Sequence, residues 1–199
     1  EGKFYFDAIL GDYTIENLEL SIPGYHNLEN ALAAISVCFE IGLNDKEISD
    51  GLASYTGVKR RFELIVNRDQ IIYIDDYAHH PTEIEALLKS VKSIYPGKKI
   101  TAIFQPHLYS RTRDFAEGFS RSLSMADRVI LLPIYPAREL PINGVESEML
   151  LGGINAREKE CLDKESALLE VKKINEGVLL SIGAGDIDQL VPKIKKILR

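Results

Sequence analysis

Ionisable and aromatic side chains gather in residues 74–88, IDDYAHHPTEIEALL, between an apolar run and residues with helical spacing. They are Asp75, Asp76, Tyr77, His79 and His80. A packed core has little use for such a group, because burying a charge is costly unless the charge is paired. The same side chains suit proton transfer, ligand binding or metal coordination. We therefore expect this segment to face a ligand.

A dedicated transition-metal site is disfavoured for these residues. Carboxylates and imidazoles are suitable ligands, yet His79 and His80 are adjacent and lack the i, i+4 spacing of a helical zinc motif. The two cysteines, Cys38 and Cys161, have no metal-binding spacing either. We expect no metal ligands in this chain.

A second polar group lies in FQPHLYSRTRDF, residues 104–115, again where a predicted strand ends and a helix begins. Arg111 stands near the start of that helix, where backbone N–H groups favour an anion. Arg113 is expected on a solvated face. With His26 in PGYHNLEN and His107 in this segment, all four histidines fall in three short motifs. The alternative that each histidine is only a polar loop residue stays open.

Glycine-rich phosphate motifs are incomplete. GAGDI, residues 183–187, follows a predicted strand, but Asp188 occupies the third glycine position of a dinucleotide fingerprint. The segment instead predicts a tight turn close to a ligand. No G-x-x-x-x-G-K-[ST] sequence occurs, so a triphosphate cradle is not expected in this chain.

Strands and helices alternate from residue 62 onward. Predicted strands span 62–66, 71–75, 99–104, 128–133 and 177–182, and predicted helices span 81–94, 111–124, 164–174 and 188–198. This alternation predicts an α/β fold with a mostly parallel sheet and helices on both faces. Functional groups should then lie on loops after the strand carboxyl ends. Residues 134–160 are less regular.

The first 56 residues have a different pattern. Strands are predicted at 3–10 and 16–22, followed by a helix from Asn27 that ends at Gly42 and a shorter helix at 46–54. The polar segment 57–61, GVKRR, is the predicted domain boundary. Because the chain begins with Glu1 directly in a strand-like stretch, we expect it to be part of a longer polypeptide.

Composition narrows the class of protein. The 199 residues are 45% hydrophobic and 27% charged, which is typical of a soluble globular protein, and the net charge is -6. With this net charge we expect neither a nucleic acid nor an anionic membrane as a partner. No apolar run approaches the roughly 20 residues of a membrane helix, and we expect no signal peptide. Cytoplasm is the expected location.

Five motifs, in order, resemble the second half of a Mur ligase. They are PGYHNLENALAA, GVKRRFE, IDDYAHHPTEIEA, FQPHLYSRT and GAGDI, and the resemblance covers essentially the whole chain. DDYAHHPTE and FQPH-x-YSRT together are highly specific and resemble most the member that joins L-alanine to UDP-N-acetylmuramate. The resemblance implies an ATP-dependent ligase of peptidoglycan synthesis that works through an acyl phosphate.

The same resemblance implies a domain plan. Residues 1–56 would be the C-terminal tail of the central ATP-binding domain, 57–61 a hinge, and 62–199 the Rossmann-like amino-acid-binding domain. The P-loop, the magnesium ligands and most of the UDP-sugar pocket would precede Glu1. The chain alone is therefore expected to be inactive.

Residue roles are also implied by the resemblance. On the ATP side, His26, Asn27 and Asn30 would hold adenine, Arg61 the phosphates and Asp76 the ribose hydroxyls. On the amino-acid side, the matching residues are Tyr77, His79, His80, His107 and Arg111. Of these, His79, His80 and Arg111 are the candidate catalytic residues, and Tyr77, His107 and Arg111 the candidate substrate-binding ones. Leu108 departs from the family pattern, which has arginine at that position in many members.

Two alternatives remain open. One is a related ligase that joins a ready-made murein tripeptide to the same sugar. The other is a non-catalytic module that binds a nucleotide or an amino acid. Tyr77 and the continuation PTEI favour the alanine enzyme.

Overall fold

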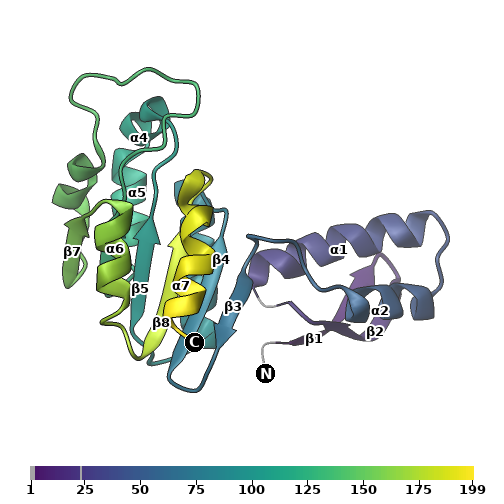
Figure 1. Ribbon diagram of the computed structural model, residues 1–199. Coiled ribbons are helices and arrows are strands. Elements are labelled where there is room, and N and C mark those ends of the chain that lie inside the picture. The colour runs from purple at the N-terminus through teal and green to yellow at the C-terminus, as the bar shows by residue number, and fades with distance from the viewer. Residues whose placement is uncertain (1–2, 23) are drawn as a thin grey trace. The chain divides into compact units, whose positions relative to one another are not determined.

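The computed structural model describes residues 3–22 and 24–199, apart from the side chains of Tyr25 and His26. The chain divides into two compact units, Glu1–Val58 and Lys59–Arg199 (Figure 1). The division falls inside the segment 57–61 in which the sequence predicts a hinge.

The first unit is a hairpin covered by two helices. Strands β1 (Phe4–Leu10) and β2 (Tyr13–Leu20) pair antiparallel, and helices α1 (Tyr25–Glu40) and α2 (Asp45–Ser54) follow. Its core is formed by Ala8, Ile15, Leu18, Ile35 and Ile48. Helix α2 begins with a capping box, in which Asn44 and Glu47 each accept the other's backbone N–H, so the polar side chains set where this helix starts.

The second unit, residues 59–199, contains a six-stranded sheet in the order β3-β4-β8-β5-β6-β7. The strands are β3 (Glu63–Asn67), β4 (Ile71–Asp76), β5 (Ile100–Phe104), β6 (Arg128–Leu131), β7 (Glu158–Cys161) and β8 (Gly177–Ile182). Only β3 runs antiparallel to its neighbour, and the remaining pairs are parallel. The predicted fold class is confirmed.

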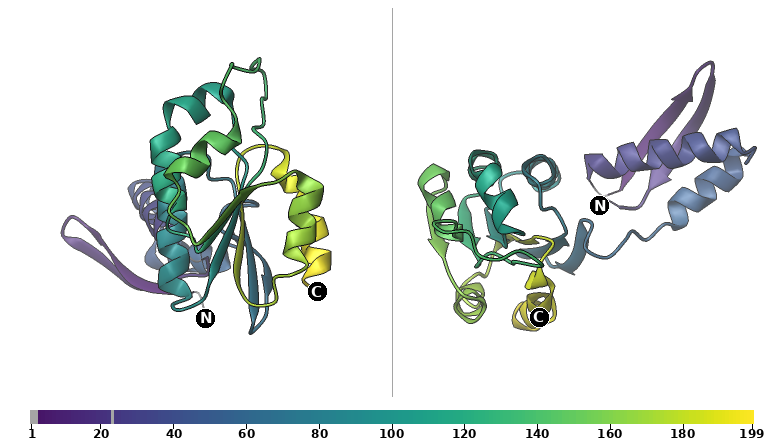
Figure 2. Two further views of the ribbon diagram at one scale, coloured as in Figure 1. Left: turned by 90° about the vertical axis from the view of Figure 1, so that its left-hand side faces the viewer. Right: turned by 90° about the horizontal axis from the view of Figure 1, so that it is seen from above.

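Helices cover both faces of this sheet (Figure 2). One face packs against α3 (Pro81–Ile94), α5 (Ala116–Leu123) and the 3-10 helix η1 (Ser147–Gly153). The other face packs against α6 (Lys164–Val171), the 3-10 helix η2 (Asp186–Leu190) and α7 (Val191–Ile197). The central strands β4, β5 and β8 are therefore buried along their whole length, as their apolar runs predict.

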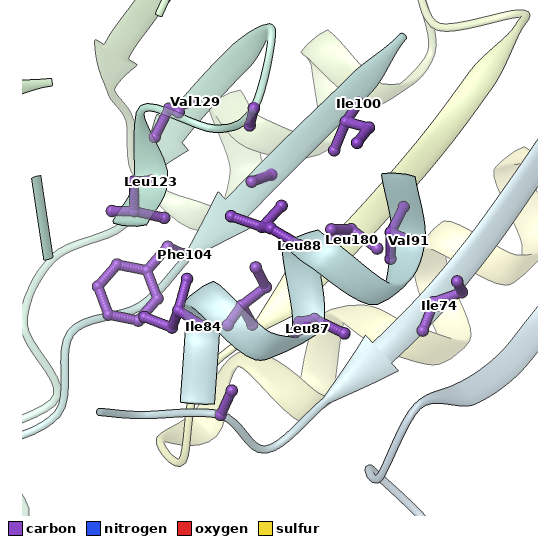
Figure 3. Packing of buried hydrophobic residues seen from close by; sticks show 14 of the residues in the cluster. Ile74, Ile84, Leu87, Leu88, Val91, Ile100, Phe104, Leu123, Val129 and Leu180 are labelled. Carbon is purple, nitrogen blue, oxygen red and sulfur yellow. The ribbon is translucent and has the colours of Figure 1, made fainter. Parts of the chain in front are cut away.

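Helix α3 shows how sequence spacing becomes packing. Ile84, Leu87, Leu88 and Val91 recur at helical spacing and point toward Ile74, Ile100 and Leu180 of the sheet (Figure 3). All four helix residues are at most 1% exposed. This contact fixes α3, and with it the loop between β4 and α3, against the sheet.

Several boundaries differ from the sequence predictions. The single helix predicted at 111–124 is two helices, α4 (Tyr109–Asp114) and α5, separated by Phe115 at φ −114° and ψ 20°. The helix predicted at 188–198 is η2 followed by α7, because Pro192 has no N–H for an i−4 bond and suits a helix start. Strand β7 was not predicted, since EKEC is short, polar and at the sheet edge.

Candidate functional site

The carboxyl end of β4 carries two buried carboxylates on opposite sides of the strand. Asp76 is 5% exposed, and its two oxygens accept the backbone N–H groups of Phe62 at 2.7 Å and Ala78 at 2.8 Å. Burial raises the pKa of Asp76 to about 6, and the two N–H donors oppose that rise. The carboxylate therefore joins the segment before β3 to the loop after β4.

Asp75 is held by a polar chain through the sheet. Arg60 Nε donates to Asp75 Oδ2 at 3.0 Å, and the Ser181 hydroxyl donates to Asp75 Oδ1. Tyr73 in turn contacts Ser181 at 2.9 Å between the hydroxyl oxygens. Burial raises the pKa of Asp75, while Ser181 and Arg60 act against that rise. Asp75, for which the family resemblance implies no role, thus joins Arg60 to β4 and β8.

These contacts hold a backbone that is otherwise unfavourable. Arg60 and Phe62 have φ of 62° and 50°, in the left-handed region that side chains with a Cβ rarely adopt. Such conformations cost on the order of 1–3 kcal/mol each and persist when surrounding contacts determine them. Asp75 and Asp76 supply those contacts, so the start of the unit is set by the end of β4.

The adjacent histidines have different surroundings. His80 is the N-cap of α3: its Nδ1 accepts the Thr82 N–H at 3.4 Å and lies 2.9 Å from the Thr82 hydroxyl oxygen. Its ring meets Phe115 edge-on at 4.7 Å between ring centroids. The Glu83 carboxylate accepts the backbone N–H of both His79 and His80. His80 therefore starts the helix, which leaves His79 as the histidine that meets other predicted site residues.

Rings from three loops form a row at the carboxyl edge of the sheet. Tyr77 meets His79 edge-on at 5.3 Å between ring centroids, and His79 meets His107 at 6.3 Å. His107 stacks on Tyr135 at 5.7 Å with 20° between the planes. The structure thus brings together Tyr77, His79 and His107 from the loops after β4 and β5, and adds Tyr135 from the loop after β6.

Arg111 lies beside this row. Its Nη1 is 3.5 Å from His107 Nδ1. Burial, then the Arg111 charge and His79, lower the pKa of His107, so the imidazole is uncharged at neutral pH. A neutral ring next to a guanidinium leaves the positive charge on Arg111 available for an anion.

Two arginines approach the other end of the row. The guanidinium carbons of Arg60 and Arg61 lie 5.1 and 6.0 Å from the centroid of the Tyr77 ring. Arg60 is already paired with Asp75, whereas Arg61 is exposed. Arg61, for which the family resemblance implies a phosphate contact, is therefore on the surface, next to the predicted substrate tyrosine.

GAGDI forms a turn whose close approach is to protein. A Cβ on Gly183, at φ 142°, would lie 2.6 Å from the Gln105 carbonyl oxygen. A Cβ on Gly185 would lie 2.4 Å from Gln105 Oε1 and 2.7 Å from Tyr135 Cβ. The Gln105 amide also bonds Asp186 and the N–H of Ile187. These glycines let β8 and its loop close against the β5 and β6 loops.

The predicted adenine residues lie in the first unit. Asn27 and Asn30 line a cavity of about 360 Å³ whose other walls are mostly apolar residues of β2, α1 and α2. Asn27 is buried and Asn30 is exposed. The His26 side chain lies outside the described residues. Apolar walls with two amides suit a flat heterocycle that offers donors and acceptors on one edge.

Within residues 3–22 and 24–199, no group of three or more histidine, cysteine, aspartate or glutamate side chains is placed to hold a metal ion. In the same part of the chain, no helix is both long enough and apolar enough to cross a bilayer.

Comparison with known proteins decides the family. Residues 60–185 match the family described as Mur ligase, glutamate ligase domain. The chain belongs to the Mur ligase family. The predicted resemblance is confirmed, and the matched residues run from the Asp75-bound Arg60 to the Gly185 turn.

Among relatives, a UDP-N-acetylmuramate–L-alanine ligase of Flavobacterium johnsoniae is 46% identical over all of this chain and 44% of that protein. The crystal structure of a UDP-N-acetylmuramate–alanine ligase from Thermotoga maritima is 31% identical, with a TM-score of 0.72, over 90% of this chain and 39% of that one. A murein peptide ligase from Psychrobacter arcticus is 23% identical at TM-score 0.65, over 99% and 42%, and shares the fold. This Mur ligase chain thus spans less than half the length of these relatives.

Sequence reasoning missed some residues that build the site. Tyr135 and Glu139 lie in a segment without strand or helix periodicity, so nothing in their spacing marked them. The Arg60–Asp75–Ser181 chain joins residues far apart in sequence. Glu83 carried a signal, since a glutamate three residues after an N-cap is the capping-box spacing.

His80→Ala should lower the free energy of unfolding by about 1 kcal/mol, because alanine cannot accept the N–H groups at the start of α3. His80→Asn should recover most of that loss, since asparagine is a strong N-cap. Urea denaturation followed by circular dichroism measures both. His79→Ala is the matched control, and an equal loss there would show that capping does not distinguish the two histidines.

The carboxyl carbon of Asp76 should titrate with a midpoint near 6 in a ¹³C NMR experiment, because burial raises the pKa of this side chain. The folded chain then holds this proton more tightly than the unfolded chain does. The contribution of Asp76 to the free energy of unfolding should therefore fall as pH rises from about 4 through about 6. A midpoint below 4 would show that the two N–H donors outweigh burial.

Proposed function

We propose that this chain is the amino-acid-binding part, together with the end of the ATP-binding domain, of an ATP-dependent ligase that joins L-alanine to UDP-N-acetylmuramate in peptidoglycan synthesis. Residues 1–56 would be the tail of the ATP-binding domain, 57–61 the hinge and 62–199 the amino-acid-binding domain. The observation that carries the proposal is the guanidinium of Arg111 beside His107, in the row of rings at the carboxyl edge of the sheet. The names of the alanine-ligase relatives support the same substrate pair.

The reaction sets two demands. Two of its substrates, ATP and UDP-N-acetylmuramate, are anions, and L-alanine carries a carboxylate. An acyl phosphate made from ATP and the sugar carboxylate must also meet an amine before it meets water. Fixed positive groups meet the first demand, and closure of the domains the second. The exposed carboxyl edge of this sheet, where arginines flank a row of rings, suits the first of these tasks.

Arg111 is the group that fits the carboxylate of L-alanine. A guanidinium offers paired donors that match two carboxylate oxygens. Neutral His107 adds no competing positive charge, and its ring stacking on Tyr135 fixes its plane. His79 extends the same wall. In this proposal these side chains bind and orient the amino acid, and no histidine is required to act as the base.

The adenine of ATP fits the cavity lined by Asn27 and Asn30, since their amides can both donate and accept. Arg61, exposed near Tyr77, would meet the phosphates. Asp76 remains the proposed ribose contact, although its oxygens already accept two backbone N–H groups. Magnesium would neutralise phosphate charge when bound.

The tripeptide-joining ligase is the second candidate. A murein peptide ligase from Psychrobacter arcticus, at 23% identity, has the same fold. The relatives at 46% identity over the whole chain carry the alanine-ligase name, which favours L-alanine. Competition between L-alanine and the tripeptide on the full-length enzyme separates the two candidates.

The full-length protein that contains this chain should release phosphate from ATP only when UDP-N-acetylmuramate and L-alanine are both present. Residues 1–199 alone should show no such release, because no triphosphate-binding motif is present in them. A coupled phosphate assay with product detection by mass spectrometry measures both. Ligation by residues 1–199 alone would contradict the domain assignment.

Arg111→Ala in the full-length enzyme should raise the KM for L-alanine or lower kcat by roughly tenfold or more, since a charge-assisted hydrogen bond contributes about 1.5–3 kcal/mol. Arg113→Ala is the matched control, because Arg113 lies on the same helix, pairs with Asp114 and is exposed. Steady-state kinetics with varied L-alanine measures both. Equal kinetics for the two variants would argue that Arg111 is only solvated.

A further inference from the structure

The loop after β6 is fastened to the loop after β5. The Tyr135 N–H donates to the Pro106 carbonyl at 2.8 Å, and the Leu108 N–H donates to the Tyr135 carbonyl at 2.9 Å. His107 and Tyr135 thereby form a parallel bridge beyond the ends of both strands. The pairing of β5 and β6 is thus continued by one bridge in the loops, at the site histidine.

The chain turns sharply just after His107. Leu108 has φ 73° and ψ 135°, which is unfavourable for a leucine. Its carbonyl accepts both the N–H of Thr112 at 3.1 Å and the Thr112 hydroxyl at 2.7 Å. Helix α4 starts here and has only six residues, so its position depends on contacts at its first turn.

Glu139 supplies such a contact from the β6 loop. One of its oxygens accepts the Ser110 N–H at 2.9 Å, and the other accepts the Ser110 hydroxyl. These bonds hold the pKa of the Glu139 carboxyl below its usual range, so it is ionised at neutral pH. The next residue after Ser110 is Arg111.

We propose that Glu139 is a positioning residue that clamps the first turn of α4 and so keeps Arg111 beside His107. No contact of Glu139 with substrate is needed for this role. The clamp acts through Ser110, one residue from the guanidinium that the proposed function assigns to the amino acid. The inference deepens that function, but its geometry does not depend on which amino acid is bound.

The charged groups around His107 allow a test based on the direction in which the pKa of His107 shifts. Arg111 and His79 lower the pKa of His107, Glu139 raises it, and Tyr135 stacks on the ring without charge. If Glu139 were only a nearby charge, removing it would lower the pKa of His107. If Glu139 positions Arg111, removing it releases the guanidinium, and the pKa of His107 should rise because the stronger influence is lost.

The experiment is a ¹H–¹³C NMR titration of the His107 ring in the 199-residue chain. Glu139→Ala should raise the midpoint, in the same direction as Arg111→Ala. Glu139→Gln, which keeps an acceptor for Ser110 without the charge, should lower it slightly. Arg138→Ala, an exposed neighbour in the same loop, should leave it unchanged.

Two further variants keep the result decisive. Ser110→Ala removes one of the two clamp bonds and should shift the midpoint as Glu139→Ala does, by less. In an Arg111→Ala background, Glu139→Ala should no longer raise the midpoint, because there is no guanidinium to release. A fall in midpoint for Glu139→Ala, equal to that for Glu139→Gln, would overturn the proposal.

Kinetics on the full-length enzyme separate this inference from the proposed function. Glu139→Ala should raise the KM for L-alanine by roughly three- to tenfold with a smaller change in kcat, because a misplaced Arg111 binds the amino acid less tightly. The KM of Glu139→Gln should stay within about twofold of the parent value. An NMR shift of the expected sign without any L-alanine-dependent ligation would leave the clamp standing and remove the substrate assignment. Unchanged KM with active enzyme would remove the clamp's role in binding.

Discussion

The site depends on how two adjacent carboxylates are buried at the end of one strand. Asp75 and Asp76 stand on opposite sides of β4, which is buried on both faces, so each needs its own partners. Asp75 is bound by Arg60 and Ser181, and Asp76 by the backbone N–H groups of two other residues. An unpaired charge here would destabilise the unit more than any surface ion pair could offset. The chain before β3 must therefore return to the end of β4.

That constraint determines where the functional loops begin. Once Phe62 and Ala78 are bound to Asp76, the residues that follow have little freedom, and Tyr77 is placed between the arginines and His79. Strand β8 lies between β4 and β5, so the glycine turn after it must be thin enough to let their loops meet. The row of rings across the carboxyl edge is thus a consequence of strand order and of the buried carboxylates.

Much of this was predictable from the sequence, for physical reasons that differ between elements. Helix α3 was predicted at its observed bounds, because proline at its start and a regular apolar stripe are local signals. The loops after β4 and β5 were predicted to carry the site, since polar residues end buried strands there.

Local signals fail where tertiary contacts decide the structure. Adjacent histidines look alike in sequence, and only the turn of the chain makes His80 a cap and directs His79 to His107. Glu139 acts on Ser110 in α4, far from it in sequence, and leaves no pattern of its own.

Leu108 shows how a departure from the family pattern can be tolerated. The resemblance implies arginine at this position in many members, and leucine has no charge with which to contact a phosphate or a substrate. In the structure its N–H donates to Tyr135 and its carbonyl accepts from Thr112. These hydrogen bonds do not involve the leucine side chain. Any residue here would have to accept the same positive φ. The guanidinium beside His107 comes from Arg111, one helical turn further on, and the clamp by Glu139 acts on that turn. Backbone geometry at 108 and charge at 111 are therefore separate requirements, and this chain keeps both.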